Sequence, residues 1–194
     1  MEIGATKAVQ DRLKTTKIEE SKGASLVFCW DTHLTKIKGR NVLFIVNASN
    51  RYTIAMTDIE PRNWNYYAMY ISRVIHGVMQ EMGYSEEQIR QYFKMSGYTT
   101  VTKTHGRKSV GGINRMVMDA QYFGKKLEKE AKYQWELSEY LNRDICQPEG
   151  FDAYGYPSEL FKLDMERLGI AAKRKPAKVI DFAQYIENNR GTNH

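Results

Sequence analysis

The spacing of apolar residues changes once along the chain, and this change limits what the chain can fold into. Between residues 25 and 56 apolar side chains alternate with their neighbours, as Leu26, Phe28 and Trp30 do, and alternation is typical of half-buried β-strands. From residue 64 onward apolar residues recur at every third or fourth position, which is typical of amphipathic helices. A run of strands followed by a run of helices predicts an α+β fold.

Two of the expected strands stand out. Residues 42–46 are apolar at every position, so we expect a central strand that is covered on both of its faces. Residues 98–104 are rich in threonine and valine, whose branched side chains favour extended backbone, and they predict a further long strand after the first helices.

The helical part of the chain carries recognisable start signals. A helix is predicted over residues 64–82, because Pro61 suits its first turn. Ser85 and Gln88 have the spacing of a capping box, which predicts the start of a second helix. The apolar stripe that begins at Ile113 predicts one long helix running on to about Ile145.

We therefore predict an antiparallel sheet of about four to five strands with helices packed on one side and a helical C-terminal extension. The α+β core is expected to cover residues 1–146, and the extension residues 147–194. Within the extension, Val179 to Asn188 forms an amphipathic stripe that would be marginal as a free helix. We expect it to dock on the body or on a second copy of the chain, which would make the protein a homo-oligomer.

Composition limits the class of protein. The 194 residues include 42% hydrophobic and 27% charged residues, which is typical of a folded globular protein. The longest apolar runs are far shorter than the roughly 20 residues that a membrane-spanning helix needs. Residues 1–22 lack the apolar stretch of a signal peptide. We expect a cytoplasmic protein with no membrane partner.

The sequence shows no metal or cofactor motif. Cys29 and Cys146 do not form a C-x-x-C pair, and no histidine lies at ligand spacing beside either of them. The four histidines include no H-x-x-x-H or H-E-x-x-H pair. We therefore expect two reduced thiols, no metal and no cofactor.

Positive charge is concentrated in two stretches that contain no aspartate or glutamate, residues 32–57 and 93–118. Together they carry nine bases: Lys36, Lys38, Arg40, Arg51, Lys94, Lys103, Arg107, Lys108 and Arg115. If the two stretches met on one face, they would create a field that attracts phosphates. The alternative is a set of solvated surface bases that acids from other elements balance.

The segment from residue 103 to 115 lies between a predicted strand and a predicted helix and combines glycines, a serine and several bases. Helix N-termini bind anions because free amides and the helix dipole both point at the ligand. The segment has neither the Walker A nor the G-x-G-x-x-G order. The residues that we expect to bind phosphate or nucleic acid are Lys103, Arg107, Lys108, Ser109, Gly112, Asn114 and Arg115.

A purely structural interpretation of this turn stays open. The glycines would then let the helix pack closely on the sheet, Ser109 would only cap the helix, and Arg107 would pair with a carboxylate.

Two motifs resemble those of a known family. The sequence W-D-T-H at residues 30–33, followed by a hydrophobic strand, is similar to a Trp-x-x-His strand. Residues 103–114 are similar to a Thr-x-x-Arg-Ser-x-x-Gly-x-x-Asn turn, although Lys108 here separates the arginine from the serine. Over about residues 3–123 the chain thus resembles an uncharacterised bacterial domain of unknown function, found on chromosomes, plasmids and prophages. The resemblance implies no reaction.

Catalytic groups are few. Asp31 and His33 lie two residues apart on a predicted strand and so share a face, which suits an acid/base pair if a cleft opens there. His33, His105 and Arg107 together would resemble a nuclease-like group, with histidine as acid/base and arginine as phosphate clamp.

We favour a non-enzymatic binding protein, an accessory factor of a bacterium or mobile element, that uses a basic face to bind nucleic acid or a partner protein. The first alternative is a phosphate-ester enzyme with His33, His105 and Arg107 in its site. The second is an inhibitor or antitoxin that acts by protein contacts only, for which the aromatic residues Phe151, Tyr154 and Tyr156 would suit a contact surface.

Overall fold

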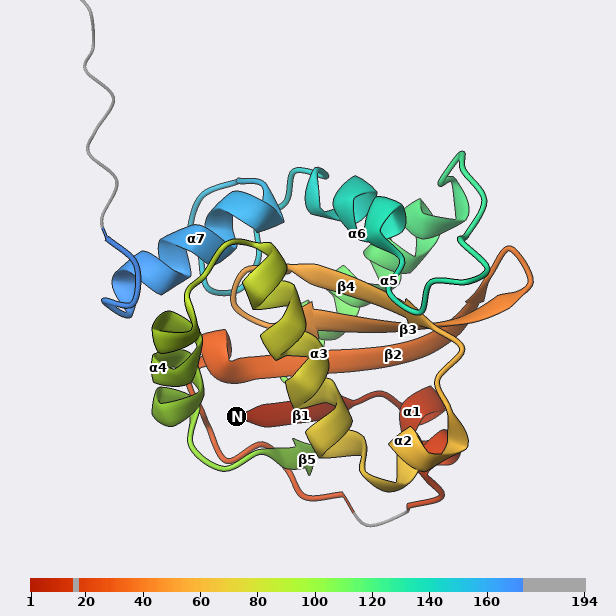
Figure 1. The fold of residues 1–194 in the computed structure, drawn as a ribbon, viewed down its shortest axis with the longest axis horizontal. Coiled ribbons are helices and arrows are strands. Elements are labelled where there is room, and N and C mark those ends of the chain that lie inside the picture. Colours follow the sequence, from red (N-terminus) through yellow and green to blue (C-terminus); the bar gives the residue numbers. More distant parts are fainter. Residues whose placement is uncertain (16–17, 173–194) are drawn as a thin grey trace, which may run out of the picture.

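The computed structural model describes residues 1–15 and 18–172, in which a five-stranded sheet lies between two groups of helices (Figure 1). The strands lie side by side in the order β4-β3-β2-β1-β5. They are β1 (Glu2–Ala5), β2 (Cys29–Ile37), β3 (Arg40–Asn47), β4 (Thr53–Thr57) and β5 (Thr100–Thr102).

The helices of the described residues are α1 (Lys7–Leu13), α2 (Pro61–Asn65), α3 (Tyr67–Glu81), α4 (Glu86–Ser96), α5 (Arg107–Gln121), α6 (Trp135–Asn142) and α7 (Pro157–Arg167), and a short 3-10 turn covers Leu26–Phe28. Most helices follow the β2–β4 strands, as the change of spacing predicts, but α1 precedes β2, and β5 lies between α4 and α5. The capping box is confirmed at the start of α4, where Ser85 and Gln88 bond each other's backbone. No helix in this part of the chain is long and apolar enough to cross a membrane.

The sheet is mixed rather than antiparallel, which corrects the predicted fold class. β2, β3 and β4 form the expected antiparallel meander, but β1 lies between β2 and β5 and runs parallel to both. β1 has four residues, Glu-Ile-Gly-Ala, too few for an alternating pattern to be recognised. A parallel neighbour also requires a crossover connection, which no local signal reveals.

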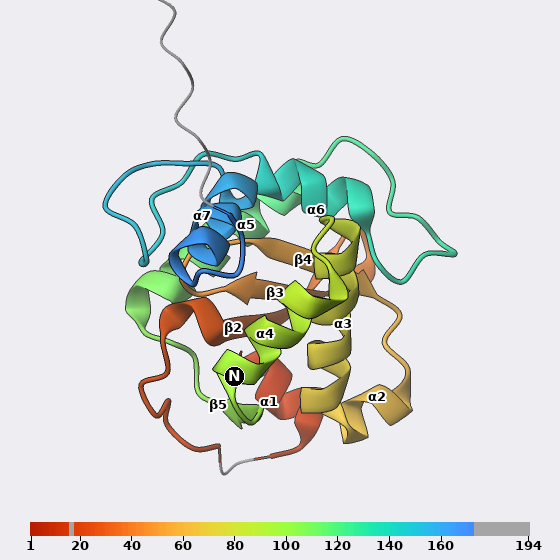
Figure 2. The same ribbon diagram turned by 60° about the vertical axis from the view of Figure 1, so that its left-hand side comes forward.

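Helices cover both faces of the sheet, so the prediction of one-sided packing is wrong. On β3, Leu43 and Ile45 pack in a core with α3, α4 and α7. Val42, Phe44 and Val46 point the other way and pack against α5 and α6. The two views show α3 crossing one face and α5 lying behind the sheet (Figures 1 and 2). The expectation that this strand is covered on both faces is confirmed, whereas its place in the sheet is second from the edge, between β4 and β2.

The predicted long helix from Ile113 to Ile145 is two helices. The chain leaves α5 after Gln121 and runs through a loop before α6 begins at Trp135. The buried side chain of Gln134 holds this loop, because it accepts a hydrogen bond from the Glu128 N–H and donates one to the Thr57 hydroxyl. The apolar spacing continues through the loop because Phe123 and Leu127 are also buried in the α5 core.

α6 and the loop before it cover the outer edge of β4. Asn142 accepts a hydrogen bond from Thr53 N at 2.8 Å and donates one to Thr53 O at 2.8 Å. Ser138 accepts from Ala55 N at 3.0 Å, and Gln134 N donates to Ala55 O at 2.9 Å. These groups replace the backbone of a sixth strand, so the edge offers few free partners to another chain.

The described part of the predicted C-terminal extension belongs to the core. Phe161 and Met165 on α7 are buried with the α3 core, and Asp164 accepts a hydrogen bond from Asn50 in the turn between β3 and β4. The predicted boundary at residue 146 therefore does not coincide with a break in packing. The amphipathic segment Val179 to Asn188 lies outside the described residues, so its docking stays a prediction.

The cover on β4 generates a stability prediction. Asn142→Ala leaves the buried N–H and C=O of Thr53 without a partner, which costs about 1–3 kcal/mol for each buried group left unpaired. Urea denaturation followed by circular dichroism should show a lower midpoint. Asn114→Ala, on the exposed face of α5, is the matched control and should change the free energy of unfolding by less than about 0.5 kcal/mol. Equal midpoints for the two variants would contradict this role of Asn142.

Candidate functional site

Strands β1 and β2 carry a cluster of polar side chains on the face of the sheet opposite Ile3 and Trp30. In the parallel pairing of β1 with β2, Glu2 lies beside Cys29, and Gly4 lies beside Asp31. Residues two apart on a strand share a face, so the side chains of Glu2, Cys29 and Asp31 gather on one side. All three are buried.

His105 completes this cluster from the turn that follows β5. Its Nδ1 lies 2.7 Å from Asp31 Oδ1, and its Nε2 lies 3.0 Å from Glu2 Oε2. The backbone N–H of His105 also donates to Asp31 Oδ1 at 3.2 Å. Both ring nitrogens are therefore bound to carboxylates, and only 2% of the His105 side chain is exposed.

Gly4 provides the space in which Asp31 and His105 meet. A Cβ atom at this position would lie 1.8 Å from Asp31 Oδ1 and 3.1 Å from His105 Nδ1. Both distances are below ordinary van der Waals contact, and the first would be a collision. The buried ion pair thus depends on a residue of β1 that carries no side chain.

The start of α5 is fixed by the same carboxylate. The helix begins at Arg107, and its N-cap is Gly106, which has a φ of +94° that favours glycine. Ser109 is the third residue of the helix rather than its cap, which corrects the expected capping role, and its hydroxyl donates to Asp31 Oδ2. Asp31 therefore supplies the negative charge that the start of a helix favours.

The electrostatics of the cluster favour a charged histidine. Burial disfavours the imidazolium, but the hydrogen bond and charge of Asp31, followed by those of Cys29, outweigh it and raise the pKa of His105 to about 10. Burial would likewise raise the pKa of Glu2, but hydrogen bonds from Ser21, the Lys22 N–H and His105 outweigh it and lower that pKa.

The three residues of the nuclease-like hypothesis have different environments. His33 Nδ1 lies 3.2 Å from the Thr6 hydroxyl, and its pKa is lowered by burial. His105 is enclosed by Glu2 and Asp31. The side chain of Arg107 is exposed and forms no hydrogen bond or ion pair within residues 1–15 and 18–172. His105 has no ring nitrogen left for a substrate.

A basic hollow lies beside the first two turns of α5. It has a volume of about 280 Å³, and its lining includes Arg51, Lys108, Arg115 and Glu149. Arg51 reaches it from the turn before β4 and donates to the carbonyl of Gly112 at 2.7 Å. A Cβ on Gly112 would lie 3.1 Å from Arg51 Nε, so the glycine gives the guanidinium room to lie against the helix.

The hollow gathers only some of the residues predicted to bind anions. Lys108, Ser109, Gly112 and Arg115 line it, whereas Arg107 and Asn114 are exposed on α5 outside its lining. Lys103 is paired with Glu20. Gly111 and Gly112 lie in the body of the helix, where backbone amides bond the preceding turn, so an anion cannot use them as expected.

Bases of the two acid-free stretches meet at this hollow. Arg51 comes from the first stretch and joins Lys108 and Arg115 from the second. Arg40 instead pairs with Asp58, and Lys38 donates to the carbonyl of Lys125. Neither Arg40 nor Lys38 lines the hollow.

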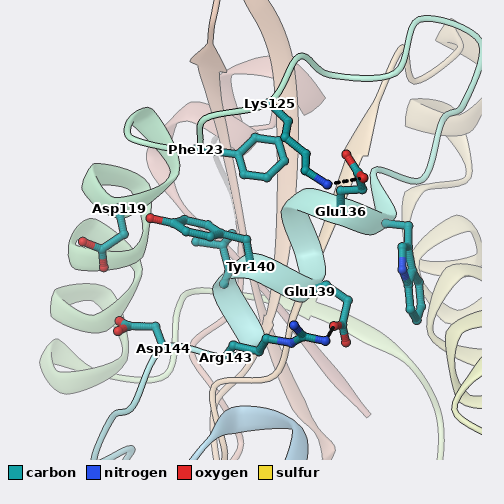
Figure 3. Close-up of a pocket in the computed structure, with 10 residues that line it drawn as sticks. Asp119, Phe123, Lys125, Glu136, Glu139, Tyr140, Arg143 and Asp144 are labelled. Atoms are coloured by element: carbon teal, nitrogen blue, oxygen red, sulfur yellow. Dashed lines mark hydrogen bonds and ion pairs between the residues drawn. The ribbon is translucent and has the colours of Figure 1, made fainter.

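A larger hollow of about 580 Å³ lies between α5 and α6 (Figure 3). The lining contains aromatic rings, four carboxylates and two bases: Phe123, Trp135, Tyr140, Asp119, Glu136, Glu139, Asp144, Lys125 and Arg143. Lys125 pairs with Glu136 and Arg143 with Glu139 along its sides. Of the remaining two carboxylates, that of Asp119 lies 3.7 Å from Arg115 Nε, and that of Asp144, at the α5 end, has no ion pair among the described residues.

The fold and the cluster define an α+β domain with a mixed sheet, built around a buried group of two carboxylates, a histidine and a thiol. The chain belongs to the family described as a domain of unknown function (DUF6933), which it matches over residues 2–160. No curated protein and no solved structure matches it.

Sequence reasoning missed Glu2 and Gly4 and assigned Asp31 the wrong partner. Asp31 and His33 share a face of β2 as expected, but Asp31 binds His105, 74 positions along the chain. No sequence spacing encodes this contact, because it follows from the insertion of β1 between β2 and β5. A signal was nevertheless present, since a glycine between apolar strand residues often marks a close approach of another group.

The close approach of Asp31 to Gly4 can be tested by a substitution that adds a Cβ atom. Gly4→Ala forces Asp31 away from His105 and should lower the free energy of unfolding by about 1–3 kcal/mol through overpacking alone. The measurement is the midpoint of urea denaturation. Gly77→Ala in α3 is the control, because a Cβ there meets nothing within 4 Å, and it should be neutral or stabilising by up to about 1 kcal/mol. A Gly4→Ala protein as stable as the control would contradict the close approach.

Proposed function

We propose that this protein is a non-enzymatic binding protein that holds the phosphate backbone of a nucleic acid in the basic hollow beside α5. The observation that carries the proposal is the meeting of Arg51, Lys108 and Arg115 around one hollow. Three bases face one acid there, Glu149, so the local charge favours an anion.

The three bases have different tasks in this proposal. Arg51 is positioned by its hydrogen bond to Gly112 O and supplies a fixed guanidinium. Arg115 has 73% of its side chain exposed and lies 3.7 Å from Asp119, so it can turn toward a phosphate at little cost. Lys108 donates to the carbonyl of Pro148 at 3.4 Å, a long contact that a phosphate oxygen can replace.

The size of the hollow suits this ligand. A volume of about 280 Å³ lies just below the range of roughly 300–1,000 Å³ for small-molecule pockets, so a phosphate group fits better than a larger metabolite. Backbone contacts of this kind give affinity without sequence specificity.

The burial of His105 argues against the phosphate-ester enzyme. General acid/base catalysis needs a group within hydrogen-bond reach of the substrate. His105 is bound at both nitrogens and closed off from solvent. His33 and Arg107 alone would lack a second acid/base group, so the binding function is the better account.

A second candidate function is the binding of a partner protein in the hollow between α5 and α6. The exposed rings of Trp135 and Tyr140, with the carboxylates of Asp119 and Asp144, could receive a lysine or arginine side chain. This second function fits an inhibitor or antitoxin that acts by protein contacts.

The nucleic-acid proposal predicts a change in the salt dependence of binding. The double variant Lys108→Ala and Arg115→Ala should bind duplex DNA more weakly, and its log–log salt slope should flatten by about 0.9 for each phosphate that the variant no longer neutralises. Fluorescence anisotropy of a labelled duplex at several salt concentrations measures both quantities. Arg51 stays unchanged, because its hydrogen bond to Gly112 also supports the fold.

The matched control removes the same charge elsewhere. Arg90→Ala with Lys94→Ala takes two bases from exposed positions on α4, so a general loss of charge would weaken both double variants equally. Equal loss would reject the hollow as the site. If the unchanged protein shows no salt-dependent binding to DNA or RNA, the nucleic-acid proposal fails, and the hollow between α5 and α6 becomes the site to test with Tyr140→Ala.

A further inference from the structure

The buried cluster contains three donor atoms of different kinds close together. The Sγ of Cys29, a carboxylate oxygen of Glu2 and a ring nitrogen of His105 all lie within 4.8 Å of one another. The pairing of β1 with β2 brings Glu2 and Cys29 side by side, and the turn after β5 places His105 over them.

Sulfur, imidazole nitrogen and carboxylate oxygen together form a ligand set for a borderline-soft dication. Zn²⁺ is bound in proteins by these three donor types, usually in a tetrahedron. Hard ions such as Mg²⁺ and Ca²⁺ prefer oxygen ligands only, so Cys29 argues against them.

The surroundings of His105 match those of a metal ligand. A histidine that binds a metal usually donates its other ring N–H to a carboxylate, which fixes the ring and its tautomer. Asp31 Oδ1 lies 2.7 Å from Nδ1, and this contact leaves Nε2 directed at Glu2.

Glu2 is positioned in the same way. Its Oε2 accepts a hydrogen bond from the Ser21 hydroxyl at 2.6 Å, and its Oε1 accepts one from Lys22 N at 2.9 Å. Both oxygens are thus oriented before any ion binds, as the outer contacts of metal sites do for their ligands.

We propose that Glu2, Cys29 and His105 bind one transition-metal dication of the zinc class, and that Asp31 positions His105 for this role. On binding, the ion takes the lone pairs of His105 Nε2 and Cys29 Sγ, and the two protons that these atoms carry leave to solvent. One dication replaces two protons, so the net charge of the buried cluster does not change.

The burial of the ligands indicates a structural ion rather than a catalytic one. Three protein ligands leave one position of the tetrahedron to a water molecule, but Glu2, Cys29 and His105 are all buried, so a substrate has no access to the ion. The ion would join β1, β2 and the turn that leads into α5. Its binding energy would therefore add to the stability of the fold.

The first experiment measures binding to the full chain. Protein stripped with a chelator is dialysed against Zn²⁺ or Co²⁺, and retained metal is counted by mass spectrometry of the digested sample. We expect one ion per chain, a higher melting temperature with Zn²⁺, and a Co²⁺ spectrum with a thiolate charge-transfer band. No retained ion, or the spectrum of free aqueous Co²⁺, would overturn the proposal and leave a hydrogen-bonded cluster only.

The second experiment uses the other buried cysteine as a matched control. Cys29→Ser should lose the charge-transfer band and bind Zn²⁺ at least about tenfold more weakly, whereas Cys146→Ser should keep both. A band that survives in Cys29→Ser, or disappears in Cys146→Ser, would reject Cys29 as a ligand. Circular dichroism verifies that each variant is folded.

Asp31→Asn provides a further variant, whose fold is also verified by circular dichroism. Asp31 positions His105 but does not bind the ion, so its change should weaken the affinity for Co²⁺ about ten- to hundredfold. The thiolate charge-transfer band comes from Cys29 and should remain at saturating Co²⁺. Unchanged affinity would reject its positioning role. The metal site does not depend on the basic hollow, so Lys108→Ala with Arg115→Ala should bind metal like the unchanged chain.

Discussion

The buried carboxylate of Asp31 is the interaction on which the arrangement of this protein depends. It lies on β2, passes over the backbone of β1 at Gly4, binds both the ring and the backbone of His105 after β5, and accepts the hydroxyl of Ser109 on α5. Three strands and a helix are thus joined at one group. A buried carboxylate without such partners would cost several kcal/mol, so these elements must keep their positions together.

The position of α5 in turn determines the character of the surface. Lys108 and Arg115 face the turn that carries Arg51, whereas Asp119, one turn later, faces α6 and Asp144. One helix therefore lines a basic hollow with its first half and an acidic hollow with its second. Because Ser109 is bound to Asp31, the helix cannot shift along its axis or turn about it without breaking the buried cluster, so both hollows keep their positions.

Local signals predicted several elements, but the strand expected over residues 98–104 is only the three residues of β5, and the parallel pairing of β1 was not predicted. The continuous apolar run from Val42 to Val46 identified β3 as a doubly covered strand, and Ser85 with Gln88 marked the start of α4, because each signal depends on nearby residues only. The break between α5 and α6 was missed because the loop also buries apolar side chains. The cluster around Asp31 could not be predicted, since Glu2 and His105 meet only when β1 has entered the sheet.

The position of β1 in the sheet affects the order in which the strands can pair during synthesis of the chain. The second, third and fourth strands are neighbours in sequence and can pair as soon as they emerge from the ribosome, but β1 needs β5, almost a hundred residues later, as its outer neighbour. Contacts between distant residues form slowly because the loop between them must first be ordered. During synthesis the first strand would therefore have one bare side until most of the domain has been translated. The shortness of β1 limits the exposed edge that it presents in that interval.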